Sequence, residues 1–187
     1  MKIRESDMPK EEEWTRFFDA QEILRQFGLN RDVNDVVDFG CGFGTFTIPA
    51  AQMISGNICA LDIEPEMIRA VKRKARELNL KNVKPILRDF ISKGSGVKDS
   101  SVDFVLVFNI LHLEKPINLL KEANRILIPR GKAGIIHWNY DSTTPRGPQM
   151  NIRPKPEQIK QWAESVGFIF ERQFDFKPYH YGFLSRK

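Results

Sequence analysis

The sequence predicts an α/β protein with a doubly wound, mostly parallel β-sheet and helices on both faces of that sheet. Short apolar segments alternate with amphipathic stretches of helical period, which is typical of repeated strand–helix units. A glycine-rich turn follows the first apolar segment, and residues 102–108 are almost continuously apolar, as expected of a strand buried on both faces. The chain of 187 residues is long enough for a sizeable core, so we expect a single domain over 1–187.

In the first half of the chain, glycines, prolines and acids delimit the expected elements. Apolar residues at helical spacing predict a helix over 11–27, ended by Gly28, with a kink or break at residues 17–19. Pro65 predicts the start of a basic amphipathic helix. The expected elements are strands over 34–39, 57–62 and 83–88, helices over 44–54 and 65–80, and an exposed loop over 93–101.

The second half continues the alternation and ends in a hairpin. Residues 129–131 predict a turn between a helix and a strand, and Lys177-Pro178 predicts the hairpin turn, so one of the last strands runs antiparallel to its neighbour. The expected elements are strands over 102–108, 132–138, 168–176 and 179–185, helices over 115–128 and 157–166, and a polar loop over 139–156. A loop of that length in a compact domain is usually functional.

The glycine-rich turn is Asp38-Phe39-Gly40-Cys41-Gly42-Phe43-Gly44. Glycine is needed where φ is positive or where a ligand comes too close for a Cβ atom. In a doubly wound sheet, ligands bind beyond the carboxyl ends of the strands, beside the first strand. Asp62 ends the second strand, and its two acceptor oxygens suit the adjacent hydroxyl groups of a ribose. These features predict a ligand that contains a nucleoside.

The spacing of the turn disfavours a dinucleotide. The dinucleotide fingerprint is Gly-x-Gly-x-x-Gly, but Thr45 stands where its third glycine belongs. Asp38, Asp62 and Asp89 follow the first three strands. Three carboxylates suit a cationic ligand with an amino group and disfavour a pyrophosphate.

At these residues the chain resembles the class I S-adenosylmethionine-dependent methyltransferases, in particular the small methyltransferase type 11 group. The resemblance covers nearly the whole chain and rests on five segments, 37–44, 60–63, 88–90, 102–113 and 126–131. It implies a Rossmann-like sheet of seven strands in the order 3-2-1-4-5-7-6, with strand seven antiparallel. It also implies S-adenosyl-L-methionine as the cofactor and methyl transfer as the reaction.

The resemblance assigns roles to the residues that end the strands. Gly40 and Gly42 would let the backbone approach the methionine part of the cofactor, and Asn109 would face the same part. Asp62 would accept from the ribose hydroxyls, and Asp89 from the adenine amino group. The residues expected to bind the cofactor are Asp38, Gly40, Cys41, Gly42, Asp62, Ile63, Asp89, Phe90 and Asn109.

Catalysis and substrate binding are less sharply predicted, because methyl transfer depends mainly on alignment and needs a base only if the acceptor loses a proton. We expect His112 first and His137 second as a catalytic base, although His137 can instead point into the sheet. Residues 1–30 are expected to form a cap or lid, and loop 139–156 to lie on the substrate side. The residues expected to contact substrate are Trp14, Phe18, His112, Asn139, Arg146 and Arg153. The alternatives are packing for the aromatics and solvated loop charge for the arginines.

The acceptor is expected to be a small molecule methylated on O, N, S or C. Residues 109–112 read Asn-Ile-Leu-His, whereas nucleic-acid amino-methyltransferases of this class carry a Pro-Pro-aromatic motif there. The net charge is +5, and the densest cluster of basic residues lies on the outer side of helix 65–80. A run of charge on a helix is usually its solvated face, so we do not expect nucleic acid as a partner. The two cysteines lack the spacing of a metal site. Because no apolar run reaches membrane length and no signal peptide is evident, we expect a cytoplasmic protein without a membrane partner.

Two other functions stay open at this point. One is a nicotinamide-dependent oxidoreductase, which the missing third glycine and the absence of a Tyr-x-x-x-Lys pair disfavour. The other is a non-catalytic cofactor-binding protein with the same fold. Binding of S-adenosylhomocysteine or of NAD distinguishes the first alternative from a methyltransferase.

Overall fold

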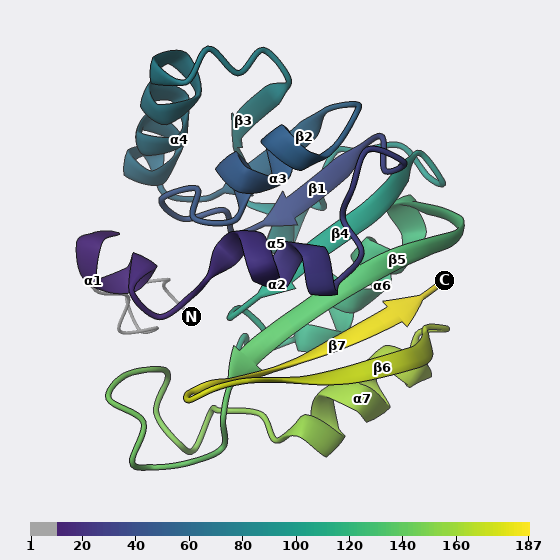
Figure 1. Ribbon diagram of the computed structural model, residues 1–187. Coiled ribbons are helices and arrows are strands. Elements are labelled where there is room, and N and C mark those ends of the chain that lie inside the picture. The colour runs from purple at the N-terminus through teal and green to yellow at the C-terminus, as the bar shows by residue number, and fades with distance from the viewer. Residues whose placement is uncertain (1–10) are drawn as a thin grey trace.

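The computed structural model describes residues 11–187 and has the doubly wound sheet that the sequence predicts (Figure 1). Its strands are β1 (Val36–Phe39), β2 (Ile58–Asp62), β3 (Val83–Leu87), β4 (Val102–Phe108), β5 (Leu127–Trp138), β6 (Ile169–Phe176) and β7 (His180–Arg186). They lie in the order β3-β2-β1-β4-β5-β7-β6, and β7 runs antiparallel to both β5 and β6. The predicted order and the antiparallel last strand are therefore confirmed. The first ten residues of the expected 1–30 cap lie outside the described residues.

Helices cover both faces of this sheet, as Figure 1 shows. They are α1 (Glu11–Thr15), α2 (Ala20–Gln26), α3 (Thr47–Met53), α4 (Pro65–Glu77), α5 (Phe90–Lys93), α6 (Pro116–Ile126) and α7 (Pro156–Ser165). Successive strand residues point to opposite faces, so Val36 packs in the same cluster as α2 and α3, whereas Val37 packs with α6 and α7. No helix within residues 11–187 is long and apolar enough to cross a membrane.

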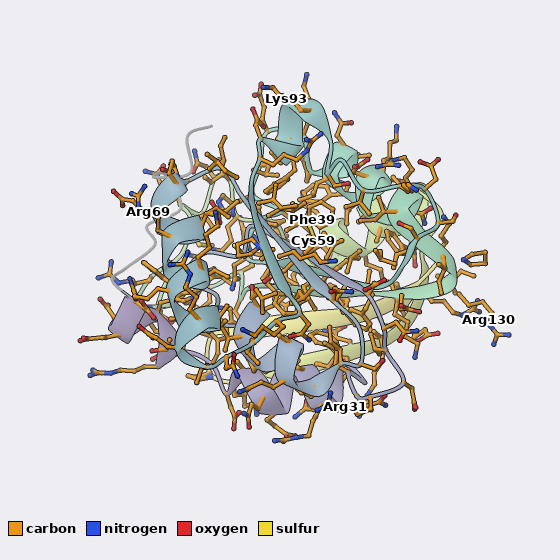
Figure 2. All side chains as sticks on the ribbon, turned by 90° about the horizontal axis from the view of Figure 1, so that it is seen from above. Arg31, Phe39, Cys59, Arg69, Lys93 and Arg130 are labelled. Atoms are coloured by element: carbon orange, nitrogen blue, oxygen red, sulfur yellow. The ribbon has the colours of Figure 1, made fainter. Side chains whose placement is uncertain are left out.

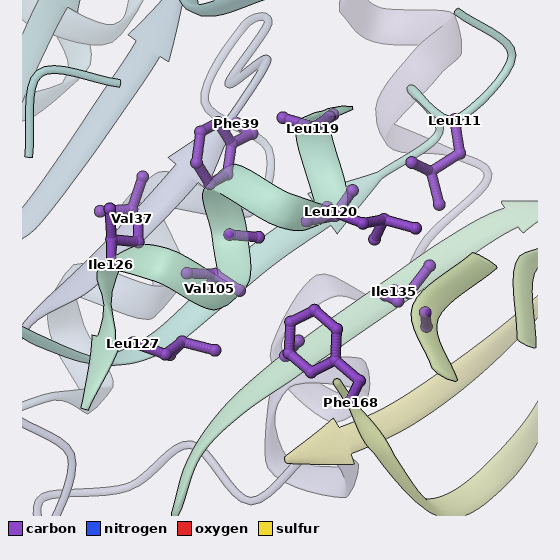
Figure 3. Close-up of a cluster of buried hydrophobic side chains, with 14 of the residues drawn as sticks. Val37, Phe39, Val105, Leu111, Leu119, Leu120, Ile126, Leu127, Ile135 and Phe168 are labelled. Atoms are coloured by element: carbon purple, nitrogen blue, oxygen red, sulfur yellow. The ribbon is translucent and has the colours of Figure 1, made fainter. Parts of the chain in front are cut away.

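The core beneath α6 fixes the ends of the central strands. Phe39 of β1 and Val105 of β4 are fully buried there with Leu119 and Leu120 of α6 (Figure 3). Charged side chains such as Arg69 lie at the periphery in Figure 2, while Phe39 lies inside. Close packing of this kind holds the carboxyl ends of β1 and β4 in fixed relative positions, which a binding site at that edge needs.

The break expected at residues 17–19 is confirmed, since the helix predicted over 11–27 is divided into α1 and α2, and the carboxylate of Asp19 accepts from the Glu22 backbone N–H at 3.0 Å to cap α2. Two other local expectations differ from the structure. The turn expected at residues 129–131 is instead part of β5, whose pairing with β4 shifts there by several residues. The loop expected over 93–101 follows α5, a short helix over Phe90–Lys93 that was not expected, and its Ser95 is buried rather than exposed, with its hydroxyl donating to Glu122 at 2.6 Å.

Candidate active site

A pocket lies at the carboxyl end of the sheet, beneath α1 and beside the loop over 139–155, and Figure 1 shows both segments at that edge. It has an empty volume of about 830 Å³, which includes its open mouth. Its described lining residues are Trp14, Gly40, Gly42, Asp62, Met67, Phe90, Phe108, Asn109, Ile110, His112, Leu113, Trp138 and Pro148.

The glycine turn forms one end of the pocket. Gly40, Gly42 and Gly44 all have positive φ, at +73°, +52° and +81°, a conformation that L side chains rarely adopt. A Cβ atom on Gly40 would lie 2.7 Å from Cδ1 of Ile110. The backbone N–H groups of Gly40 and Cys41 donate to the carbonyl oxygen of Leu61 at 2.8 and 3.0 Å, which ties the turn to β2. The turn therefore presents bare backbone to the pocket.

Asp62 joins the turn to the end of β2. Its side chain is 4% exposed, and its two oxygens accept from the backbone N–H groups of Gly42 and Glu64, each at 2.9 Å. Burial raises the pKa of this carboxyl, while these hydrogen bonds act in the opposite direction. Each carboxylate oxygen keeps a second lone pair for a ligand hydroxyl. Asp62 thus fits the ribose role that the resemblance implies.

Asp38 lies behind the turn and does not line the pocket. Its buried carboxyl accepts from the hydroxyl of Thr47, the first residue of α3, at 2.5 Å. Burial raises its pKa to about 7, with the Thr47 hydrogen bond lowering it and Asp62 raising it. Cys41 is buried as well and packs against α4 in a small apolar cluster. Both residues therefore support the turn from behind.

Asn109 provides polar atoms that have no partner within the described residues. It follows β4 with φ of +52°, and its backbone N–H donates to the carbonyl oxygen of Ile136 at 2.8 Å. Both polar atoms of its side chain are buried and unpartnered there, although it lines the pocket. Buried polar atoms normally have partners. A ligand with carboxylate and ammonium groups, such as the methionine part of the cofactor, would satisfy both.

Of the residues expected to contact the adenine, only Phe90 lines the pocket. Phe90 is buried and lines the pocket, next to Phe39. Asp89 accepts from the backbone N–H of Ser92 at 3.0 Å and from its hydroxyl at 2.6 Å, which lowers its pKa and caps α5. Ile63 is 38% exposed and does not line the pocket. The contacts of Asp89 and Ile63 with adenine stay predictions.

Histidines gather at the opposite end of the pocket. His112 lines the pocket and is 7% exposed, and its Nδ1 is buried without a partner among the described residues. Burial, with a smaller effect of the Arg153 charge, lowers its pKa to about 4. His137 lies behind it at a ring distance of 5.7 Å, fully buried and outside the lining, so it is packed in the interior and does not face the pocket. His180 packs on Trp138 at 4.2 Å because β5 and β7 pair Trp138 with His180.

Aromatic side chains close the pocket from above. Trp14 of α1 lines the pocket together with Trp138, and their ring centroids are 6.3 Å apart. Phe18 is not a lining residue, since it packs instead against Phe46 at 5.1 Å and His180 at 4.5 Å. Of the two aromatics expected to contact substrate, only Trp14 therefore faces the pocket.

The polar residues expected in the loop make contacts within the protein. The buried guanidinium of Arg153 donates to four carbonyl oxygens and the Thr144 hydroxyl, at 2.7 to 3.3 Å. The guanidinium of Arg146 pairs with the Glu13 carboxylate, with an N–O distance of 2.7 Å, and so joins the loop to α1. The Asn139 amide donates to the carbonyl oxygen of Pro178 at 3.2 Å. No sequence pattern indicated that these groups would hold the loop together.

The fold and this pocket define a cofactor-binding α/β enzyme domain of the methyltransferase type. Residues 36–131 match the family model described as a methyltransferase domain, and the chain belongs to this family. The family and the solved structures similar to this chain establish S-adenosylmethionine as the cofactor, and the residues present fit it.

Relatives and solved structures agree with this family. A SAM-dependent methyltransferase from Aquifex aeolicus superposes with a TM-score of 0.83 at 25% identity, covering 96% of this chain and 94% of that one. The aklanonic acid methyltransferase DauC of Streptomyces sp. (strain C5) is 28% identical over 68% of this chain and 63% of its own length. A demethylmenaquinone methyltransferase of Lactobacillus johnsonii is 33% identical over 54% of this chain and 42% of its own length. The chain thus spans less than two thirds of these two relatives.

Proposed function

We propose that this protein transfers a methyl group from S-adenosylmethionine to a small-molecule acceptor held in the described pocket. One observation carries the proposal: a single pocket runs from the glycine turn and Asp62 to His112 and Trp14. Residues suited to binding the cofactor and a candidate base thus line the same pocket. Alignment of two reactants in one shielded site supplies a large part of the rate acceleration in such displacements.

When bound, S-adenosylmethionine supplies a methyl group activated by the positive charge on its sulfur. The backbone at Gly40 and Gly42 would lie against its methionine part, and the Asn109 amide would satisfy the polar groups there. Asp62 would accept from the ribose hydroxyls with the lone pairs that Gly42 and Glu64 leave free. The buried Phe90 supports an apolar surface for the adenine.

His112 is the proposed general base. Because its pKa is about 4, the imidazole is neutral at physiological pH and has a lone pair that can accept a proton. His137 is proposed to support the ring of His112 from behind, because it lies 5.7 Å from it and outside the pocket lining. This arrangement suits an acceptor that loses a proton as it is methylated.

We further propose that residues 1–187 act as one domain in which α1 belongs to a lid. Two acidic residues of α1 support this role by linking it to separate parts of the protein. Glu11 forms ion pairs with Lys74 and Arg73 of α4, and Glu13 pairs with Arg146 of the loop. Exposed ion pairs of this kind are individually weak, so α1 can open without loss of the core.

Two measurements test the proposed function, and a deletion tests the lid. Calorimetry should detect binding of S-adenosylhomocysteine but not of NAD, and labelled methyl groups should pass from the cofactor to members of a panel of small molecules. Binding of NAD without S-adenosylhomocysteine would favour the oxidoreductase alternative. Tight cofactor binding with no methyl acceptor in a broad panel would favour a non-catalytic protein. Deletion of residues 1–15 should raise the KM for the acceptor and leave the cofactor affinity nearly intact.

A further inference from the structure

We infer that the acceptor is a flat, uncharged aromatic compound with one weakly acidic hydroxyl group, which lies against Trp14 and Trp138 with its hydroxyl toward His112. This inference rests on the proposed function and names the substrate class of the same site. The acceptor end is the end of the pocket near Trp14 and His112, opposite the glycine turn. Three of its features support this inference: its walls are apolar, it offers no charged partner to a substrate, and His112 is its base.

The walls of the acceptor end are almost entirely apolar. The side chains that form them are Trp14, Phe108, Leu113, Trp138 and Pro148. They come from α1, the end of β4 and the segment after it, the end of β5 and the 139–155 loop, so the acceptor is enclosed on several sides. Indole rings offer large flat surfaces on which other rings stack. This shape and chemistry favour an aromatic ring system.

The acceptor end lacks a counter-charge for an ionic substrate. Among the lining residues of the described chain, Asp62 is the only acidic side chain and no Lys or Arg is present, and Asp62 lies at the cofactor end. The two arginines expected there are already engaged, Arg153 with oxygens of its own loop and Arg146 with Glu13. A carboxylate or phosphate would lose its hydration without gaining an ion pair, and burial of an unpaired charge is costly.

A cationic acceptor is disfavoured by the positive charge of Arg153. This charge lowers the pKa of each of the three histidines around the pocket, although burial is the larger cause for all of them. The sulfonium of the cofactor adds a second positive charge when it is bound. An ammonium group would therefore meet two positive charges and no negative partner among the described lining residues of the acceptor end.

His112 then completes the reaction with balanced atoms. The acceptor oxygen forms a bond to the methyl carbon while its O–H bond breaks, and the proton passes to the imidazole of His112. The electron pair of the cleaved carbon–sulfur bond leaves with the sulfur of S-adenosylhomocysteine. His112 is the only base at the acceptor end among the described lining residues. One hydroxyl group near His112 is therefore all that the acceptor needs for this reaction.

Three ligands that share one ring system test this inference: 2-naphthol, 2-naphthoate and 2-naphthylmethylammonium. Their binding to the protein saturated with S-adenosylhomocysteine is measured by calorimetry, which needs no turnover. We expect 2-naphthol to bind at least tenfold more tightly than either ion, and its methyl ether to form when S-adenosylmethionine is supplied. Equal or tighter binding of either ion, or no binding of 2-naphthol at millimolar concentration, would overturn the inference.

Variants of two tryptophans locate the binding. Trp14→Ala should weaken 2-naphthol binding at least tenfold and leave S-adenosylhomocysteine binding unchanged. Trp162→Phe is the matched control, because Trp162 packs on the core cluster beneath α6 and α7 and does not line the pocket. If the unaltered protein does not bind S-adenosylhomocysteine, the proposed function itself is refuted. An equal effect of both variants would overturn the placement of the acceptor against Trp14.

Discussion

Replacement of Gly40 by alanine tests whether the glycine turn is a ligand cradle. Alanine at φ of +73° costs about 1–2 kcal/mol of stability, because the left-handed region crowds a Cβ atom. The new Cβ would also lie 2.7 Å from Cδ1 of Ile110, and since ordinary contact begins at 3.4 Å, that methyl group must retreat by about 0.7 Å. Because Ile110 lines the pocket, we expect the affinity for S-adenosylhomocysteine to fall at least tenfold, or about 1.4 kcal/mol.

Gly28 provides the matched control for this prediction. Its φ is +86°, and a Cβ atom there would meet nothing within 4 Å. Gly28→Ala should therefore show the backbone cost alone, a fall in Tm of roughly 2–8 °C for a chain of this size, with unchanged cofactor affinity. Adding Ile110→Val to Gly40→Ala removes the Cδ1 atom and should restore part of the binding. Calorimetry and thermal unfolding measure both quantities, and equal affinity in Gly40→Ala and Gly28→Ala would refute the reasoning.

Four further predictions concern charged and titrating groups. Asp62→Asn replaces one acceptor oxygen by a donor and should weaken S-adenosylhomocysteine binding about tenfold or more, as measured by calorimetry. His112→Gln should lower kcat by roughly 10²- to 10⁴-fold with unchanged cofactor affinity, and the parent rate should fall only as the pH approaches the pKa of about 4. Because His112 and His180 have folded pKa values of about 4 and about 3 against an ordinary 6.5, their contribution to stability is complete above pH 6.5 and is lost as the pH falls toward those values. Urea unfolding at pH 7.5 and pH 5 should show this loss, and a higher stability at pH 5 would contradict it. Arg153→Met should cost about 2–4 kcal/mol and raise the acceptor KM, whereas the exposed Arg69→Met should change the unfolding free energy by less than about 0.5 kcal/mol.

The sequence was most informative where a local pattern determines the structure. The spacing of Gly40, Gly42 and Gly44 predicted three positive φ values, because few other residues adopt them. The strand order and the antiparallel β7 followed from a resemblance that covers nearly the whole chain. The bulge over residues 128–131 was missed, because its register depends on β4 rather than on the residues of β5 themselves.

The acceptor end was less predictable, because it depends on contacts between distant segments. The engagement of Arg153 with its own loop and of Arg146 with Glu13 could not be read from loop composition. The packing of His180 on Trp138 requires the register in which β7 pairs with β5. Only the position of His112 after the fourth strand was a usable signal, since ligands bind beyond that end of the sheet.

The place of β7 within the sheet also has a consequence for the order of assembly. The last strand in the sequence does not extend the sheet at its edge but lies between β5 and β6, where His180 supports Trp138. A growing chain that has reached only β5 already has all the residues of the glycine turn. The indole of Trp138 still lacks its support at that stage. The cofactor end can therefore form during synthesis, while the acceptor end is completed only when the final strand is inserted.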